Sequence, residues 1–273
     1  MWKLIKMDFY RLFSSKALRV GALIACLMCA GYILFSVGII ALYQFAINED
    51  PATAMQIGSL LPQGAWLEGV DLAEIVFGGT AILSLFIGCM VSANFIGAEQ
   101  SCGYTKNFAG QLPDKGYMAV SKLAVTSLVQ ALILFVYVFV TSGLACLMLG
   151  KYIDGFSIGT LLAALGLRLM LHLAINAIIV FLCTLTKSHA IAMVAGCIFG
   201  IGITYIGYMA IGMLFGILKI DFDIVNYMPD GINSQLSLNT VGDLSVKAIT
   251  VSIAFIAVFF AANYLVMRKR DVK

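Results

Sequence analysis

Six long apolar runs divide the 273-residue sequence and constrain its fold more than any other feature. They cover residues of about 20–46, 73–96, 119–149, 162–185, 190–218 and 247–267. A hydrocarbon core about 30 Å thick needs roughly 20 mostly apolar residues per helix, so each run can span a bilayer. None of the four prolines falls inside a run, and the alternation typical of barrel strands is missing. The sequence therefore predicts an all-α membrane protein with six transmembrane helices in one domain, residues 1–273.

The overall composition agrees with this interpretation. Hydrophobic residues make up 62% of the chain, charged residues 11%, and the mean hydropathy is +1.00. Soluble domains average about 45–50% apolar and about 25% charged residues. A water-soluble core of this size does not need so much apolar surface, and we expect an integral membrane protein.

The positive charges lie on one side of the predicted spans. Thirteen of the seventeen lysines and arginines fall in alternate loops and at both ends: Lys3, Lys6, Arg11, Lys16, Arg19, Lys106, Lys115, Lys122, Lys187, Arg268, Lys269, Arg270 and Lys273. Acids dominate the other loops. Because lysine and arginine gather on the cytoplasmic side, we expect both termini in the cytoplasm of a cell with the chain in its plasma membrane. The net charge of +3 is then a sign of topology, and nothing in it indicates a nucleic-acid partner.

The seven cysteines do not predict a disulfide framework or a metal site. Six of them lie in apolar runs, and Cys102 falls in a predicted cytoplasmic loop. Cys26-x-x-Cys29 has the spacing of a redox or metal motif, but no second pair or nearby histidine accompanies it. We interpret these cysteines as small residues buried among the helices.

Residues 1–16 have the pattern of an amphipathic helix. Trp2, Ile5, Phe9, Leu12 and Phe13 share one face, and Lys3, Arg11 and Ser14 lie opposite. The pattern predicts an interfacial helix on the cytoplasmic side, with Trp2 at headgroup depth. A signal peptide is the alternative, but the basic region is too long and no small-x-small cleavage site follows. A membrane anchor and a docking site for a partner both fit this helix.

Residues 97–118 form a polar interruption between the second and third runs. A short helix is predicted there, between a break at Gly97 and a stop at Leu112-Pro113. Its polar and small residues include Glu99, Gln100, Gly103, Tyr104, Thr105, Lys106 and Asn107. A short helix outside the membrane with a span on each side has the construction of a lever. The structural alternative is that these residues only solvate a tight turn.

The fourth run carries Arg168, His172 and Asn176 at spacings that place them in one stripe of a helix. Charged groups inside a span are often functional, and the stripe fits the lining of a transport path. The interpretation we favour is that Arg168 snorkels outward while His172 and Asn176 bond neighbouring helices.

The fifth run is glycine-rich and nearly 30 residues long, which is enough to bend or to include an external piece. Gly196-x-x-x-Gly200 and Gly212-x-x-x-Gly216 permit close helix approach. Tyr205 and Tyr208 either line a path or pack in the bundle. Residues 219–246 are expected outside the membrane, with Pro229-Asp230-Gly231 as a turn.

Several chemical motifs are missing from the sequence. It holds no phosphate-binding G-x-x-x-x-G-K-[ST] loop, no H-E-x-x-H and no G-x-S-x-G. All fourteen acids are expected at or beyond span ends, whereas an ion-coupled carrier generally needs a carboxylate within the membrane. We therefore expect that this chain is not an enzyme. We expect it to be a subunit for which a partner protein supplies the energy.

The N-terminal residues Met7 to Lys16, MDFYRLFSSK, resemble the connecting helix of permease subunits of type-2 ABC exporters. Residues 97–118 resemble the coupling helix of that family, with Glu99, Gly103-Tyr104 and Leu112-Pro113, and Lys122 opens the next span. The resemblance covers the whole chain. Two positions depart from the family pattern: Tyr104 stands where a small hydroxyl residue is common, and Lys115-Gly116 stands where an arginine often sits.

The resemblance implies a pair of permeases, identical or paralogous, joined to two separate cytoplasmic ATP-binding subunits. Those subunits would hold ATP and Mg²⁺, and this chain would bind no cofactor. Their closure would press on residues 98–110, with Glu99, Tyr104 and Lys106 as contacts. Charge reversal at Glu99 is then expected to uncouple ATP hydrolysis from transport and to leave membrane insertion intact.

The cargo implied is an amphipathic or hydrophobic substrate, such as an antimicrobial or toxin peptide exported by a bacterium. Two other functions stay open at this stage. One is a non-transporting membrane scaffold or sensor that recruits a cytoplasmic partner, and the other is an ion-coupled carrier.

Overall fold

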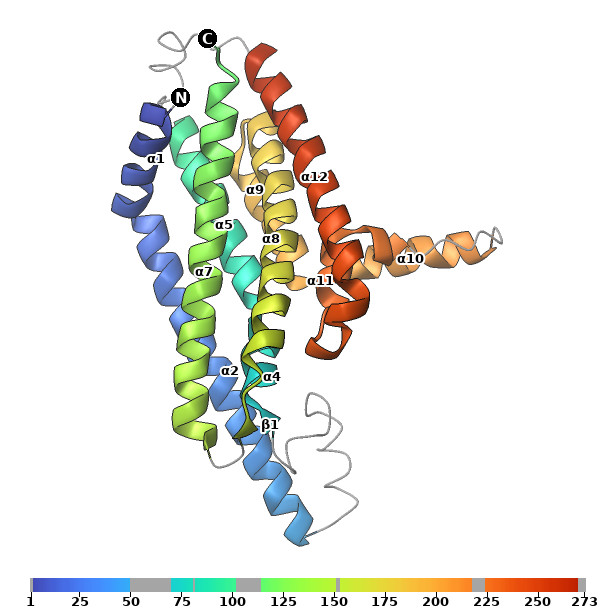
Figure 1. Ribbon diagram of the computed structural model, residues 1–273. Coiled ribbons are helices and arrows are strands. Elements are labelled where there is room, and N and C mark those ends of the chain that lie inside the picture. The colour runs from blue at the N-terminus through green and yellow to red at the C-terminus, as the bar shows by residue number, and fades with distance from the viewer. Residues whose placement is uncertain are drawn as a thin grey trace.

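The structure, a computed structural model, describes residues 2–49, 70–80, 82–101, 114–150, 153–217 and 224–269 (Figure 1). Within these ranges the chain is almost entirely helical. The elements are α1 (Trp2–Ser14), α2 (Lys16–Glu49), β1 (Val70–Asp71), α4 (Leu72–Thr80), α5 (Leu83–Ser101), α7 (Tyr117–Leu149), β2 (Ile153–Gly155), α8 (Ile158–Thr186), α9 (His189–Ile201), α10 (Thr204–Ile217), the 3₁₀ turn η2 (Ile224–Tyr227), α11 (Pro229–Gln235), the 3₁₀ turn η3 (Leu238–Thr240) and α12 (Val241–Lys269). The predicted helical fold class is confirmed.

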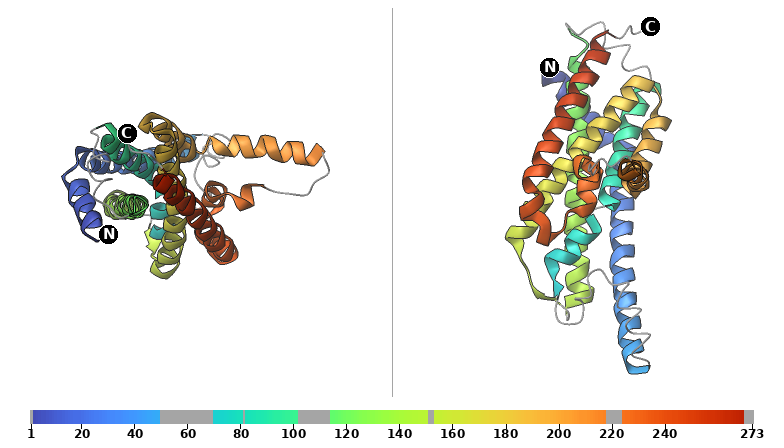
Figure 2. Two further views of the ribbon diagram at one scale, coloured as in Figure 1. Left: turned by 90° about the horizontal axis from the view of Figure 1, so that it is seen from above. Right: turned by 90° about the vertical axis from the view of Figure 1, so that its right-hand side faces the viewer.

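Five stretches of the described chain are long and apolar enough to cross a membrane. They are Lys16–Gly38, Leu72–Glu99, Tyr117–Leu149, Ile158–Thr186 and Leu238–Lys269. These match five of the six predicted spans. The long helices lie side by side in a bundle, with α1, the end of α5 and the start of α7 at the same end as the last turn of α12 (Figures 1 and 2). We call this the α1 end.

The predicted fifth span is not one straight helix. Ala190–Ile201 and Thr204–Phe215 are bent by 72° at Gly202 and Ile203, so the pair counts as a sixth span only if the broken helix is taken as one. Gly202 adopts φ +79°, a left-handed conformation that glycine reaches without strain, and it caps α9 with bonds from its N–H to the carbonyls of Ile198 and Phe199. The helix α10 then projects sideways from the bundle (Figures 1 and 2).

The first small-residue motif of this run holds α9 against α5. A Cβ added at Gly200 would meet Phe86 Cα at 2.7 Å, and one at Gly196 would meet Cys89 Cβ at 3.1 Å. The close approach expected of this motif is therefore confirmed. A Cβ at Gly212, on α10, would meet no atom within 4 Å, so this glycine of the second motif makes no such contact with the described chain.

The second span is also interrupted, between α4 and α5. Hydroxyl groups bind carbonyls at this break: Thr80 Oγ1 donates to Phe77 O at 2.7 Å, and Ser84 Oγ donates to Thr80 O at 2.5 Å. A side-chain hydroxyl that bonds backwards to its own helix often accompanies such an irregularity. A short parallel pair, Val70 with Ile153 and Asp71 with Gly155, ties the start of α4 to the segment before α8.

The segment between α10 and α12 packs back on the bundle. Its helix α11 contacts α8 and α12, and Ile232 is fully buried in the same hydrophobic cluster as Leu171 of α8. The last membrane-crossing stretch begins at Leu238 and its helix α12 at Val241, whereas the sequence predicts a start near residue 247.

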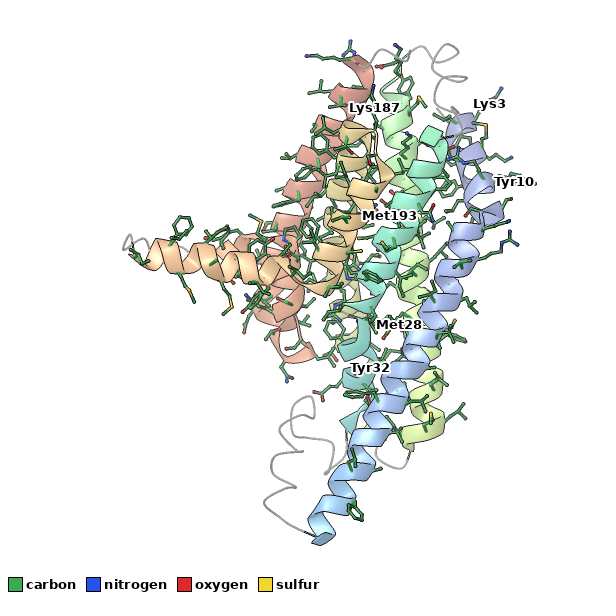
Figure 3. All side chains as sticks on the ribbon, turned by 180° about the vertical axis from the view of Figure 1, so that it is seen from behind. Lys3, Tyr10, Met28, Tyr32, Lys187 and Met193 are labelled. Carbon is green, nitrogen blue, oxygen red and sulfur yellow. The ribbon has the colours of Figure 1, made fainter. Side chains whose placement is uncertain are left out.

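The helix α1 covers the start of α7. Leu4, Ile5, Asp8 and Leu12 are buried, and Leu4 joins Met118, Ala119 and Met267 in a small cluster that links α1, α7 and α12. Trp2, Tyr10 and Phe13 are exposed, and Figure 3 shows Tyr10 pointing away from the bundle. The predicted apolar face is therefore divided, with Ile5 and Leu12 against protein and Trp2 and Phe13 outward. The location of that outward face at a membrane interface stays a prediction.

Candidate functional site

A buried group of charged residues joins three helices at the α1 end. Glu99, in the last turn of α5, is only 2% exposed. One of its oxygens accepts a hydrogen bond from Arg11 of α1, and the other lies 3.1 Å from Lys122 Nζ of α7, itself 3% exposed. A carboxylate this deep needs such partners, because an unpaired buried charge costs several kcal/mol.

Further contacts fix Arg11 and α1 in this position. The Arg11 guanidinium lies 4.5 Å above the Phe95 ring of α5 and 3.8 Å from Asp8. Ser121 Oγ of α7 donates to Asp8 Oδ2 at 2.5 Å. We call Asp8, Arg11, Glu99, Ser121 and Lys122 the Glu99 cluster. It connects the N-terminal helix to both helices that flank residues 102–113.

Most of the residues predicted to contact a partner lie in the loop outside the described residues. Gly103, Tyr104, Thr105, Lys106 and Asn107 lie outside the described residues, and Gln100 is described only as part of the α5 backbone. Glu99 faces the interior of the bundle. Of the predicted interfacial residues, Arg11 joins the Glu99 cluster, Ile5 is buried, Phe9 is half-buried, and Trp2 and Phe13 are exposed.

The stripe on α8 is buried along its whole length. Arg168 is 1% exposed, and His172 and Asn176 are fully buried. The expected outward snorkelling of Arg168 is wrong, since its guanidinium turns inward to backbone carbonyls. Arg168 Nη1 donates to Phe77 O at 2.6 Å and to Thr80 Oγ1, Nη2 donates to Leu236 O at 3.1 Å, and the guanidinium carbon lies 3.5 Å above the Phe77 ring.

These acceptors explain how the bundle holds this cation. Phe77 and Thr80 lie in the last turn of α4, at the break in the second span, and Leu236 is the C-cap residue that follows α11. The carbonyls at a helix C-terminus have no intrahelical partner and carry the negative end of the helix dipole. Arg168 therefore caps two helix ends at once. We call Phe77, Thr80, Arg168 and Leu236 the Arg168 cluster.

Asn176, two turns along the stripe, bonds a neighbouring helix. Its Nδ2 donates to Thr126 Oγ1 of α7 at 2.9 Å. Near the α1 end of α8, Thr184 Oγ1 donates in the same way to Asn263 Oδ1 of α12 at 2.6 Å. Hydrogen bonds of this kind hold helices together in a membrane.

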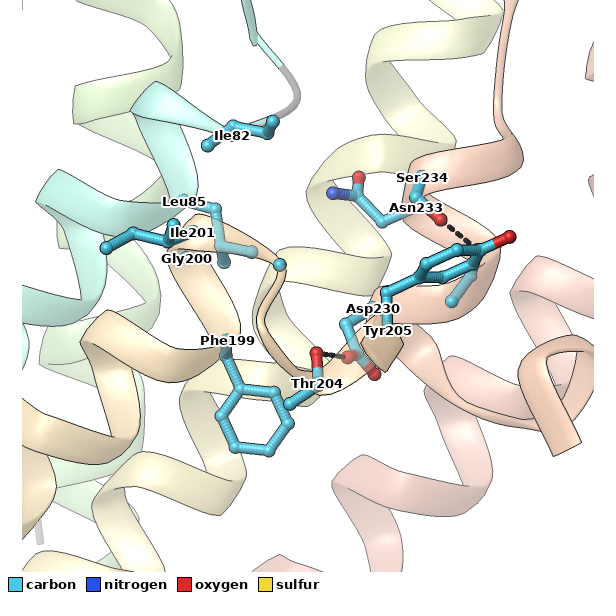
Figure 4. Close-up of a pocket in the computed structure, with 12 residues that line it drawn as sticks. Ile82, Leu85, Phe199, Gly200, Ile201, Thr204, Tyr205, Asp230, Asn233 and Ser234 are labelled. Carbon is cyan, nitrogen blue, oxygen red and sulfur yellow. Dashed lines mark hydrogen bonds between the residues drawn. The ribbon is translucent and has the colours of Figure 1, made fainter. Parts of the chain in front are cut away.

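A cavity of about 290 Å³ opens at the break between α9 and α10 (Figure 4). Asp230, at the start of α11, contributes to its wall and is 8% exposed. Thr204 and Tyr208 of α10 both donate to its carboxylate, Tyr208 at 2.8 Å. Tyr205 lines the cavity and is 42% exposed. The turn predicted at Pro229-Asp230-Gly231 is instead the start of α11, and its location outside the membrane stays a prediction.

Sequence reasoning missed several residues of these clusters. Asp8 lies among apolar residues on the buried face of α1, and Lys122 lies inside the third apolar run, so a charge at an apolar position was the available signal for both. The carbonyls of Phe77 and Leu236 leave no signal, since every residue has one. Among the described residues no three metal-binding side chains gather at one place.

No protein-family model and no curated protein matches this sequence. The helices and their length indicate a multi-pass helical membrane protein. Within that class, the two buried charge clusters are the features from which a function is argued.

Proposed function

We propose that this chain is the membrane-spanning permease subunit of an ATP-driven exporter of the type-2 ABC kind. In this proposal the α1 end faces the cytoplasm, separate ATP-binding subunits dock on the loop between α5 and α7, and a second permease completes the pathway. The cargo proposed is an amphipathic or hydrophobic substrate, most simply a peptide, exported from a bacterial cell.

The observation that carries the proposal is the Glu99 cluster. A transport subunit that does not hydrolyse ATP itself needs a rigid connection between the surface that contacts its ATP-binding partner and its membrane-spanning helices. Glu99 lies in the last turn of α5 before the loop, and Lys122 follows the loop on α7. Arg11 holds α1 to α5, and Asp8 holds α1 to α7 through Ser121. Force applied to the loop would move three helices together, because separating them breaks buried ion pairs.

The burial of Glu99 changes its proposed role. With both oxygens in ion pairs inside the chain, Glu99 transmits force between the loop and the helices, and direct contact with the ATPase passes to Tyr104 and Lys106. Charge reversal at Glu99 would place a third cation beside Arg11 and Lys122, so it would damage folding as well as coupling. Glu99→Gln is the milder test.

The experiment starts with purification of the chain from its native membrane. We expect an ATP-binding protein to co-purify and to show orthovanadate-sensitive ATPase activity in liposomes. Glu99→Gln should keep ATPase activity and lose most of the substrate transport per ATP, whereas Lys6→Gln, on the exposed side of α1, should behave as the native chain. Absence of an ATP-binding partner, or unchanged transport per ATP in Glu99→Gln, would refute the proposal.

One observation favours the second candidate, a scaffold that recruits a cytoplasmic protein. Arg168 and Asn176, for which the lining of a path was the alternative interpretation, bond other helices of the same chain. For a scaffold we expect a co-purifying protein without nucleotide hydrolysis, and liposomes that hold the pair should move no cargo.

A further inference from the structure

Two cavities adjoin on the outside of the bundle near the α1 end. The first, of about 450 Å³, lies between the turn that joins α1 to α2 and the last turns of α5. The second, of about 340 Å³, continues along α2 and α5 toward α9. Lys16, Ala17 and Asn94 line both, so the two form one groove. Met193 of α9 borders it and is visible on the face shown in Figure 3.

Charged and polar residues make up most of the residues that line the first cavity, and its cations are Arg11 and Lys16. Its wall includes the side chains of Arg11, Ser14, Ser15, Lys16 and Asn94. Its one acid, Glu99, is already paired with Arg11 and with Lys122. Lys16 is exposed, and no ion pair with it is recorded within the described chain. This cation is therefore available for a negative group in the cavity.

Backbone geometry adds to this positive character. Lys16 begins the 34-residue helix α2, whose first turn is capped by Ser15 Oγ, the acceptor of a 3.2 Å bond from Leu18 N. The start of a helix carries the positive end of its dipole. Arg19, on the next turn, donates to Ser14 O at 3.3 Å and keeps a second cation near this end. Since α1 ends at Ser14, the negative end of its dipole also lies at this turn, where Arg19 binds the carbonyls of Ser14 and Ser15. The start of α2 and Lys16 are then the positive groups that face the cavity.

The second cavity is apolar. Val20, Ile24, Phe86, Met90 and Met193 contribute its wall, with Val20 51% and Ile24 41% exposed. From Lys16 to Ile24 the groove follows α2 for about 12 Å at 1.5 Å per residue. Cationic and hydrogen-bonding groups beside an apolar channel along a helix match the polarity of a phospholipid headgroup and the first part of one acyl chain.

We propose that this groove binds one anionic phospholipid, with the phosphate at Lys16, Ser14 and Ser15 and an acyl chain between α2 and α5. The negative headgroup is preferred because Lys16 has no acid of the described chain to balance it. A free phosphate would leave the apolar half empty. The inference depends on the membrane location of the chain and is independent of transport.

The test uses the purified full-length protein in detergent and native mass spectrometry. Titration with phosphatidylglycerol and with phosphatidylcholine of the same acyl chains should show at least fivefold tighter binding of the anionic lipid, since a lysine near an anionic headgroup contributes about 1 kcal/mol. Lys16→Glu should abolish this preference. Lys6→Glu, the same charge change on the exposed side of α1, should leave it intact, and both variants should elute as folded protein.

Further measurements distinguish a phospholipid from a free phosphate as the ligand of the groove. Ile24→Trp, which fills the apolar channel, should weaken both lipids together. Inorganic phosphate and glycerol phosphate should fail to displace the bound lipid. Equal binding of the two lipids, an equal effect of Lys16→Glu and Lys6→Glu, or displacement by inorganic phosphate would each overturn the proposal, the last by showing a plain anion site.

Discussion

The Glu99 cluster and the Arg168 cluster both bury a charge inside a helical bundle, but they balance it with different chemistry. Glu99 meets two cationic side chains, Arg11 and Lys122. Arg168 meets two backbone carbonyls, a hydroxyl and an aromatic ring, and no ion pair with it is recorded in the described chain. The Glu99 cluster connects helices through pairs of side chains, whereas the Arg168 cluster connects one side chain to the ends of two helices.

The difference follows from where each cluster lies. The Glu99 cluster sits at the α1 end, beside an opening in the protein surface that Arg11 and Glu99 themselves line. The Arg168 cluster sits where the second span breaks and α11 ends, so uncapped carbonyls are already present there. In an apolar medium those carbonyls need donors. Arg168 supplies them, and its charge is stabilised by the same dipoles.

The comparison predicts the largest loss of stability at Arg168. Arg168→Met keeps much of the volume but leaves Phe77 O and Leu236 O without these donors, which should cost about 3–5 kcal/mol. Arg19 provides a matched control, because it donates to the carbonyls of Ser14 and Ser15 from an exposed position. Arg19→Met should cost less than about 1 kcal/mol. Unfolding by SDS titration in mixed micelles measures both, and equal losses would contradict our account of the Arg168 cluster.

The Glu99 cluster should behave differently when a second residue is changed. Glu99→Leu alone leaves Lys122 as a buried charge without its acid, and Lys122→Met alone leaves Glu99 with Arg11 as its cationic partner, so each should cost up to about 3 kcal/mol. The double variant Glu99→Leu with Lys122→Met removes both charges, and its loss should be smaller than the sum of the single losses by about 1–3 kcal/mol.

No such rescue should exist for Arg168→Met, because two of its acceptors are backbone atoms that substitution cannot remove. The same SDS titration, applied to the four proteins of the cycle, gives the coupling energy between residues 99 and 122. If the two losses are additive, Glu99 and Lys122 have no coupling energy. The ion pair between them would then not connect α5 to α7.

The sequence points to one residue of each cluster but not to the partners of that residue. The apolar runs predict the helices because hydrophobic length is a local property, and five of them appear as predicted. Glu99 and Arg168 could be singled out as charges in or near apolar runs. Their partners could not be assigned, because the pairing of Glu99 with Arg11 joins residues 88 positions apart and depends on how α1 folds back on α5.

The misplaced elements have a common physical cause. The break at Gly202 and the burial of Asp230 both depend on tertiary contacts of α9 and α11, and a hydropathy average over residues 190–218 gives no sign of either. Glycine in an apolar run is compatible with a straight helix and with a left-handed cap. Only packing against α5 decides between them.

A single acceptor of the Arg168 cluster should contribute less than the arginine itself. Thr80→Val removes the hydroxyl that accepts from Arg168 and donates to Phe77 O, and keeps the shape of the side chain. We expect a loss of about 1–2 kcal/mol, since the two carbonyls remain. Thr250→Val, whose hydroxyl bonds Val246 O on an exposed face of α12, is the control and should stay within about 0.5 kcal/mol. A thermal melt in detergent compares them, and an unchanged Thr80→Val would mean that Arg168 needs only the carbonyls.

The smallest effect is expected at Asp114, a charged residue of the α1 end that lies outside the spans. Tyr264 of α12 donates to Asp114 Oδ2 at 2.5 Å and Gly116 N donates to Oδ1 at 2.8 Å, and these bonds, with a lesser effect of Arg268, hold the pKa of this carboxyl below its usual value. A carboxyl with a depressed pKa stabilises the folded chain above its unfolded pKa, and this contribution is lost as the pH falls through the folded pKa.

Tyr264→Phe should therefore raise the pKa of Asp114 toward its usual value and lower the melting temperature slightly at neutral pH, with the difference vanishing in acid. Tyr10→Phe changes an exposed tyrosine of α1 and should alter neither quantity. Carboxyl carbon NMR of the labelled protein follows the titration directly. If Asp114 titrates at the same pH in both variants, the hydroxyl of Tyr264 does not stabilise this charge. The α1 end would then depend on the apolar cluster of Leu4, Met118, Ala119 and Met267 to keep α7 and α12 together.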